Sequence, residues 1–161
     1  MDKAHNIFIS HYGKHDAEVQ RIKQRLSDSG YLVRNFSVDS TNHKDGTRPS
    51  DAVIQRLLRM RINWSSTLIC LIGPDTHKRP WVNYEIRQAY LKGKRIVGVY
   101  LHGSNNAVEI PEAFKKYGGA LLGWNSIDKI GDAIEGKNMP PENPDGTSRN
   151  PIYSITRVKC N

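Results

Sequence analysis

Cysteine and long hydrophobic runs are both scarce in this chain of 161 residues. Its two cysteines, Cys70 and Cys160, are too few for a disulfide framework or a cysteine-based metal site. The longest apolar run, residues 68–72, is far shorter than the roughly 20 residues that a membrane helix needs. The first ten residues lack the hydrophobic segment and cleavage site of a secretory signal. We therefore predict a cytoplasmic protein with no metal site and no membrane span.

Several nucleotide-binding and catalytic motifs are also missing. No Gly-x-Gly-x-x-Gly or Gly-x-x-x-x-Gly-Lys-Ser/Thr run follows any predicted strand, which excludes a Rossmann dehydrogenase and a P-loop NTPase. No Gly-x-Ser-x-Gly elbow is present, so Ser10, His11 and Asp16 do not indicate a hydrolase triad.

Positive charge is plentiful, with 24 Lys and Arg against 16 Asp and Glu, a net charge of +8 and a pI near 9.6. Such a balance favours anionic partners. However, the basic residues are spread over several predicted helices instead of forming one run with interleaved aromatics. We interpret them as a solvated surface and predict neither nucleic-acid nor membrane binding.

Strand-like and helix-like segments alternate along the chain. Short β-rich runs at residues 7–10, 31–36, 67–72, 95–101 and 120–124 are separated by stretches with apolar residues at helical spacing. This alternation predicts an α/β fold with a parallel sheet, a flavodoxin-like three-layer sandwich of five strands in the order 2-1-3-4-5. The run at 67–72 is continuously apolar, as in a central strand that is covered on both faces.

Capping residues suggest where the helices begin. Ser50 can cap a helix whose apolar positions start at Val53 and Ile54, Pro80 suits the first turn of a helix over residues 79–91, and Ser126 can cap a last helix. That helix would end at Gly136. We predict one domain over residues 1–136, followed by a linker and a possible added strand within residues 137–161.

The helix predicted at residues 79–91 carries a carboxylate on its inner half. At about 100° per residue, Val82, Ile86 and Ala89 define the core direction, and Glu85 lies roughly 65° from it, with Trp81 one turn earlier on the same flank. Glu85 would thus be half buried, near the carboxyl ends of the strands, where open parallel sheets bind their ligands. A buried carboxylate is paired, hydrogen-bonded or functional. A salt bridge and a catalytic role both stay open on this geometry.

Two longer segments resemble a known family. The stretch "NIFISHYGKHDAEVQRIKQRLSDSGYLV" resembles the first strand and helix of a TIR domain, and "SSTLICLIGPDTHKRPWVNYEIRQAYLKGKRIVGVYL" resembles its third strand, catalytic helix and fourth strand. Among TIR domains the chain is similar to the ThsB-type branch of bacterial Thoeris antiphage systems, over about residues 5–136. The most specific part of the resemblance is "LIGPDTHKRPW" with the helix that follows it.

The resemblance implies an NAD-cleaving enzyme of antiphage defence. NAD would be the substrate, with no further cofactor, and Glu85 would be the catalytic glutamate. Phe8, Ser10 and His11 would line the nucleotide cleft, and Trp81 would form its wall. The product would be a cyclic or modified ADP-ribose that signals to a separate effector. A phage-derived trigger and self-association would be further partners.

Two alternatives stay open on the sequence. The chain could be a non-enzymatic TIR-like module that binds protein partners, as its basic surface and its last residues allow. It could also sense a nucleotide without cleaving it.

Overall fold

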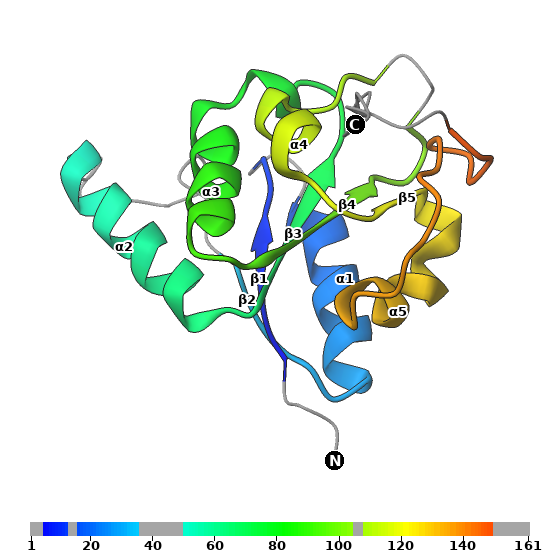
Figure 1. Ribbon diagram of the computed structural model, residues 1–161, viewed down its shortest axis with the longest axis horizontal. Helices are drawn as coiled ribbons and strands as arrows, with labels where there is room; N and C mark the ends of the chain where they lie inside the picture. The colour runs from blue at the N-terminus through cyan, green and yellow to red at the C-terminus, as the bar shows by residue number, and fades with distance from the viewer. Residues whose placement is uncertain (1–4, 13–15, 36–49, 105–107, 150–161) are drawn as a thin grey trace, which may run out of the picture.

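The sheet is fully parallel and has the predicted strand order. The computed structural model describes residues 5–12, 16–35, 50–104 and 108–149. Within these residues the strands follow the order β2-β1-β3-β4-β5 (Figure 1). Their bounds are β1 Asn6–Ser10, β2 Leu32–Asn35, β3 Thr67–Ile72, β4 Arg95–Tyr100 and β5 Leu121–Leu122. The α/β flavodoxin-like fold is therefore confirmed.

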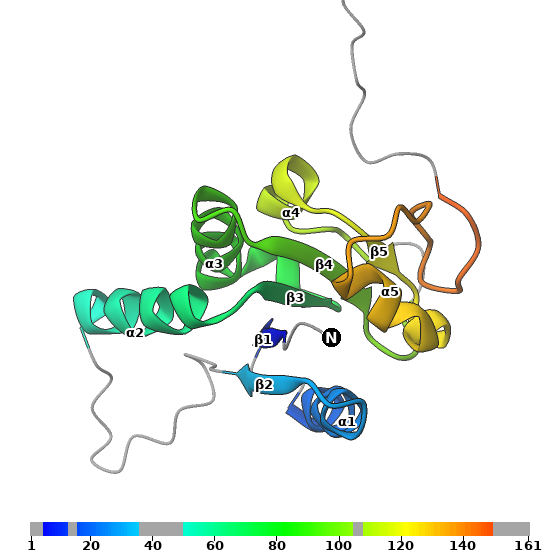
Figure 2. The same cartoon turned by 60° about the horizontal axis from the view of Figure 1, so that its bottom comes forward.

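Helices cover both faces of this sheet. The α-helices are α1 Asp16–Asp28, α2 Asp51–Trp64, α3 Pro80–Leu91, α4 Glu112–Tyr117 and α5 Ile130–Ile134, with 3-10 turns η2 Thr76–Lys78 and η3 Trp124–Lys129. Figure 2 shows α2, α3 and α4 on one face and α1 and α5 on the other. In the described ranges no helix combines the length and hydrophobicity that would let it span a bilayer.

The alternation of side chains along β3 divides the core into two halves. Leu68, Cys70 and Ile72 face α2, α3 and α4, whereas Ile69 and Leu71 face α1 and α5. All six residues of β3 are buried, which confirms the prediction of a doubly covered central strand. Glu85 belongs to α3 and therefore lies on the first of these two faces.

The start of α2 differs in part from the prediction. The side chain of Ser50 accepts a hydrogen bond from the Val53 backbone N–H at 3.4 Å, as predicted for an N-cap. However, the Val53 side chain is 48% exposed, because the first turns of α2 extend beyond the sheet (Figures 1 and 2). Ile54, Leu58 and Ile62 form the buried row of this helix instead.

The prediction that Ser126 caps the last helix is wrong. Ser126 lies inside the 3-10 turn η3, and α5 begins only after Lys129. The predicted stop is in place: Gly136 has φ +82°, a left-handed conformation that glycine adopts without strain. The Ser126 N–H already donates to the Gly123 carbonyl at 3.0 Å, so Ser126 lies within the 3-10 turn and not at the N-cap of α5.

Residues 137–149 fold back onto the edge of the sheet. The Glu142 backbone N–H donates to the Leu121 carbonyl at 3.0 Å, and its carboxylate accepts a hydrogen bond from the Gly123 N–H at 3.1 Å. Glu142 is buried by these contacts. The division of the chain after residue 136 stays a prediction. The added strand predicted at residues 152–160 lies outside the described residues, and so does the polar loop predicted at residues 37–50 except for Ser50.

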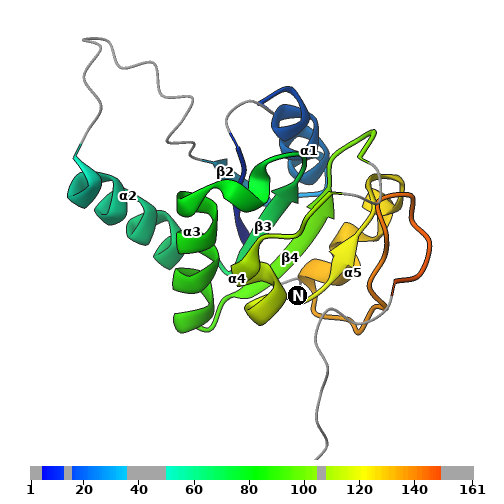
Figure 3. The ribbon, with the colours of Figure 1, turned by 90° about the horizontal axis from the view of Figure 1, so that it is seen from above.

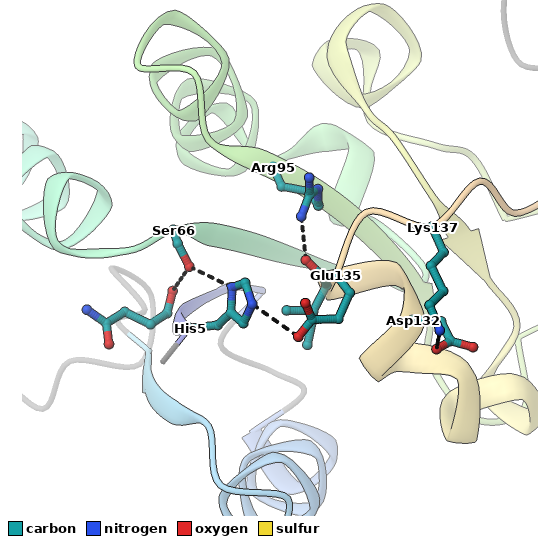
Figure 4. A network of polar contacts seen from close by, with 8 residues as sticks. His5, Ser66, Arg95, Asp132, Glu135 and Lys137 are labelled. Carbon is teal, nitrogen blue, oxygen red and sulfur yellow. Dashed lines mark hydrogen bonds and ion pairs between the residues drawn. The ribbon is translucent and has the colours of Figure 1, made fainter. Parts of the chain in front are cut away.

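A polar network closes the amino end of the sheet. His5 contacts Glu135 at 3.1 Å and lies 3.5 Å from the Ser66 hydroxyl, while Arg95 donates to the Ile134 carbonyl (Figure 4). These contacts connect the starts of the strands to the end of α5. Ligand access is therefore to be sought at the opposite, carboxyl end, where open parallel sheets bind their ligands.

Candidate active site

The carboxyl ends of β1 and β3 lie side by side at the point where the chain changes direction across the sheet. From β1 the chain continues to β2 at one edge, and from β3 it continues toward β4 and β5 at the other. Ser10, the last residue of β1, is in register with Cys70 of β3. Ligands of open α/β sheets bind at such a topological switch point.

Glu85 lies on α3, the helix that packs against β3 on the side to which Cys70 points. Figure 3, viewed from above, shows α3 beside β3. Burial raises the pKa of the Cys70 thiol, and the nearby negative charge of Glu85 raises that pKa further. Because Cys70 points toward α3 and is in register with Ser10, Glu85 acts on β3 at the level where β1 ends.

Glu85 is only 3% exposed, so the prediction of a half-buried side chain is wrong. It is buried together with Val82, Ile86 and Ala89, the three residues that define the core face of α3. The angular position of a residue around the helix axis gives the direction in which its side chain points. It does not tell how far the neighbouring strands and helices extend around that helix and cover its flanks. Here β3 and α4 both pack against α3, so the inner flank is covered as well.

Three of the predicted cleft residues come from β1 and the residue after it. Phe8 is fully buried in the same core cluster as Cys70 and Ile86, so it forms part of the core on the α3 side. His11, which follows β1 directly, is 4% exposed. The structure thus brings Phe8 and Ser10 to the same face of the sheet as Glu85, and their contact with a nucleotide stays a prediction.

The hydroxyl of Ser10 is a buried polar group without a hydrogen-bond partner among the described residues. Most buried polar atoms are satisfied, so an exception at the end of a central strand calls for an explanation. A ligand hydroxyl at the switch point would supply the missing partner.

Trp81 and Tyr84 form an aromatic pair on the first turns of α3. Their rings meet edge to face, with centroids 5.6 Å apart and an interplanar angle of 84°. Both side chains are partly buried against the core cluster. Trp81 therefore keeps exposed surface near the start of the glutamate-bearing helix, as the prediction of a cleft wall requires.

The turn that leads into α3 is held by specific contacts. The Thr76 hydroxyl accepts a hydrogen bond from the Gly73 N–H at 3.0 Å, and Asp75 adopts a left-handed conformation with φ +68°. The Arg79 guanidinium lies 3.6 Å from the ring centroid of Tyr12, which follows β1. This contact connects the loop after β1 to the loop after β3 across the switch point.

Sequence reasoning missed Asn83, which connects three segments. Its side-chain amide donates to the Arg79 carbonyl at 3.2 Å and the His77 carbonyl at 3.4 Å, and its oxygen accepts from the Ala113 N–H at 2.9 Å. The N-cap residue of α4 is Pro111, which has no side-chain acceptor, so Asn83 supplies the missing cap from the neighbouring helix. No local pattern reveals this role, because Ala113 is 30 residues away.

Metal chemistry has no preformed site in the part of the chain that the structure describes. There, no group of three or more His, Cys, Asp and Glu side chains is arranged to hold a metal ion. The predicted site residues are instead one buried carboxylate, one buried hydroxyl and aromatic or imidazole rings, and their action on a ligand stays a prediction.

Residues 8–106 match the family described as "Thoeris protein ThsB, TIR-like domain". The chain belongs to this family. The match begins within β1 and includes α3 and β4. It therefore contains all five predicted site residues, Phe8, Ser10, His11, Trp81 and Glu85.

A curated relative of this ThsB-family chain carries a more specific name. Over 95 residues the chain is 34% identical to "Putative cyclic ADP-D-ribose synthase ThsB1" of Bacillus cereus (strain MSX-D12). The aligned region covers 58% of this chain and 44% of the relative. The chain thus matches less than half of the relative's length.

Solved structures with the same fold are more distant in sequence. A 2-deoxyribosyltransferase from the psychrotolerant bacterium Bacillus psychrosaccharolyticus superposes with a TM-score of 0.57 at 18% identity, covering 76% of this chain and 90% of that one. A conserved protein from Enterococcus faecalis V583 gives a TM-score of 0.51 at 14% identity, covering 84% and 89%. At these identities the likeness supports the fold alone.

Proposed function

We propose that this ThsB-family protein cleaves NAD, releases nicotinamide, and converts the remainder to a cyclic or modified ADP-ribose that signals to a separate effector. The observation that carries the proposal is Glu85, a buried carboxylate of α3 close to the carboxyl ends of β1 and β3. The name of the Bacillus cereus relative, a cyclic ADP-D-ribose synthase, supports the same class of reaction.

One carboxylate is sufficient for this chemistry. Ordinary glycosidases need a second carboxylic acid to protonate a poor leaving group. In NAD the nicotinamide ring is already cationic, so the bond from C1′ of the ribose to the ring nitrogen breaks with both electrons going to that nitrogen, and nicotinamide leaves neutral. Glu85 would stabilise the positive charge that develops on the ribose and hold a ribose hydroxyl.

The attacking group determines the product. If water attacks C1′, it loses a proton and gives ADP-ribose. If a nucleophile within the same molecule attacks, a new bond to C1′ closes a ring and gives a cyclic isomer. The Ser10 hydroxyl, buried and without a partner among the described residues, would bind a ribose hydroxyl in either case.

The burial of Glu85 implies low activity in this conformation. At 3% exposure the carboxylate meets almost no solvent, so NAD must displace some of the surrounding packing to reach it. This favours activation by a trigger, which in antiphage defence would come from the phage.

The test is to incubate the wild-type protein and Glu85→Gln with NAD, with and without extract from infected cells, and to separate the nucleotides by mass spectrometry. Glutamine has nearly the same shape as glutamate but lacks the charge. We expect the wild type to release nicotinamide and the variant to lose roughly 100-fold or more in turnover, a loss typical of removing one electrostatic stabiliser. Equal turnover by both proteins would reject the role of Glu85. NAD binding without any product from the wild type would favour the nucleotide-sensing alternative.

A further inference from the structure

Arg149 lies at the carboxyl end of the sheet, although it is 64 residues from Glu85 in sequence. Its guanidinium donates a hydrogen bond to the Tyr100 hydroxyl at 2.7 Å, and its backbone N–H donates to the Pro141 carbonyl at 2.9 Å. Both the backbone and the side chain of Arg149 are therefore held in place.

The segment before Arg149 is a compact, self-bonded turn. Asn143 donates to the Thr147 hydroxyl and the Ser148 carbonyl, its backbone N–H bonds the Thr147 carbonyl at 2.7 Å, and Glu142 pairs with Ser148. The turn packs so closely on Gly123 that a Cβ at this position would lie 2.8 Å from the Asn143 carbonyl oxygen. Arg149 is thus delivered by an ordered structure attached to β5.

Tyr100 places the guanidinium near the candidate site. Tyr100 is the last residue of β4, in register with Ile72, and its side chain belongs to the core cluster on the α3 side. Ile72 is two residues beyond Cys70, so at about 3.3 Å per residue and 4.8 Å between strands the Cα atoms of Tyr100 and Cys70 are roughly 8 Å apart. Cys70 is the residue on which the charge of Glu85 acts.

The charge of Arg149 has no counter-ion in the part of the chain that the structure describes. No ion pair with a carboxylate is present there, and the side-chain acceptor that it does have, the phenol of Tyr100, is neutral. The side chain is partly buried, so this positive charge has lost some of its hydration. A guanidinium has five N–H donors in a rigid plane, and those not used on Tyr100 remain for a second acceptor. Such a group favours an oxyanion that can accept two hydrogen bonds at once.

We propose that Arg149 binds the diphosphate of the dinucleotide whose nicotinamide ribose lies at Glu85. The inference rests on the proposed function for the identity of the ligand. In a dinucleotide the diphosphate is separated by one ribose from the bond that is cleaved. An anion site at the end of β4, the strand next to β3, is consistent with this separation. Residues 137–149 would then be part of the substrate site, with Tyr100 as the positioning residue that aims the guanidinium.

The test compares a ligand that has the diphosphate with one that lacks it. ADP-ribose and adenosine are titrated calorimetrically into the wild-type protein, Arg149→Gln, Arg149→Lys and Tyr100→Phe. Arg56→Gln, which removes an exposed arginine of α2, is the matched control. Losing a charge-assisted contact should weaken ADP-ribose binding by roughly 10- to 100-fold in Arg149→Gln. Lysine should restore part of this loss, and Tyr100→Phe should weaken binding several-fold.

Adenosine affinity distinguishes a phosphate contact from a merely structural role. It should be unchanged in every variant, and Arg56→Gln should match the wild type for both ligands. Equal losses for ADP-ribose and adenosine, or none for either, would overturn the proposal, as would a wild-type protein that does not bind ADP-ribose. NAD turnover that depends on Glu85 but not on Arg149 would leave the proposed function standing and reject this inference. If ADP-ribose binding depends on Arg149 but the protein does not turn over NAD, the diphosphate contact stands and the proposed function is rejected.

Discussion

Replacing Asn83 by alanine tests whether side-chain hydrogen bonds hold the glutamate-bearing helix in position. The change removes two bonds to the turn before α3, at 3.2 and 3.4 Å, and one from the Ala113 N–H at 2.9 Å. A hydrogen bond contributes about 1 kcal/mol to stability, and the two longer bonds share one nitrogen. We therefore expect the free energy of unfolding to fall by about 2 kcal/mol.

Urea unfolding followed by circular dichroism measures this loss, and the midpoint should fall with an unchanged m-value. The melting temperature should drop by about 4–8 °C for a protein of this size. Asn63→Ala is the matched control, because Asn63 is an exposed residue of α2, its side chain makes only an exposed hydrogen bond to Lys92 among the described residues, and the substitution is the same. If Asn83→Ala unfolds at the same urea concentration as Asn63→Ala, the three contacts do not hold the site together.

Two further predictions concern the core around the site. At Gly98 of β4 a Cβ would lie 2.7 Å from the Phe114 ring, so Gly98→Ala should lower the free energy of unfolding by about 1–3 kcal/mol in the same urea assay, and an unchanged midpoint would show that the ring can move aside. The raised pKa of Cys70 means that the native protein keeps a proton which the unfolded chain releases near pH 8.5. Stability should therefore fall above about pH 9, by up to about 1.4 kcal/mol per pH unit. Cys70→Ala should reduce this decline of the free energy of unfolding between pH 9 and 10. If the variant and the wild type lose stability equally with pH, the buried Cys70 thiol is not the cause of the decline.

Local signals predicted most elements of the fold correctly, the start of the last helix being an exception. The continuous apolar run of β3, the Ser50 cap of α2 and Pro80 at the first position of α3 all act within a few residues of chain. Each depends on backbone hydrogen bonding or on burial that the neighbouring sequence already specifies. Strand and helix patterns alternate along this chain, and the rules for crossover connections between parallel strands allow few topologies. The strand order could therefore be predicted as well.

The site was predicted less completely, because its residues depend on distant neighbours. The helical pattern placed Glu85 on the inner half of α3, but only the packing of β3 and α4 around that helix reduces its exposure to 3%. Val53 shows the converse: it fits the apolar pattern of α2, yet its turn extends past the sheet and leaves it exposed. How exposed a residue on the apolar face of a helix is depends on which elements pack against that face. The hydrophobic periodicity of the helix carries no information about those elements.

By itself the sequence determined a five-stranded parallel α/β fold and singled out Glu85 as the carboxylate to test. Hydrophobic periodicity and capping act locally, so they can be read along the chain. Only the tertiary structure brought the Asn83 amide to α4 and the Arg149 guanidinium to Tyr100, contacts between residues 30 and 49 positions apart. Such contacts depend on how whole elements pack, and they form only when the sheet and its helices are assembled.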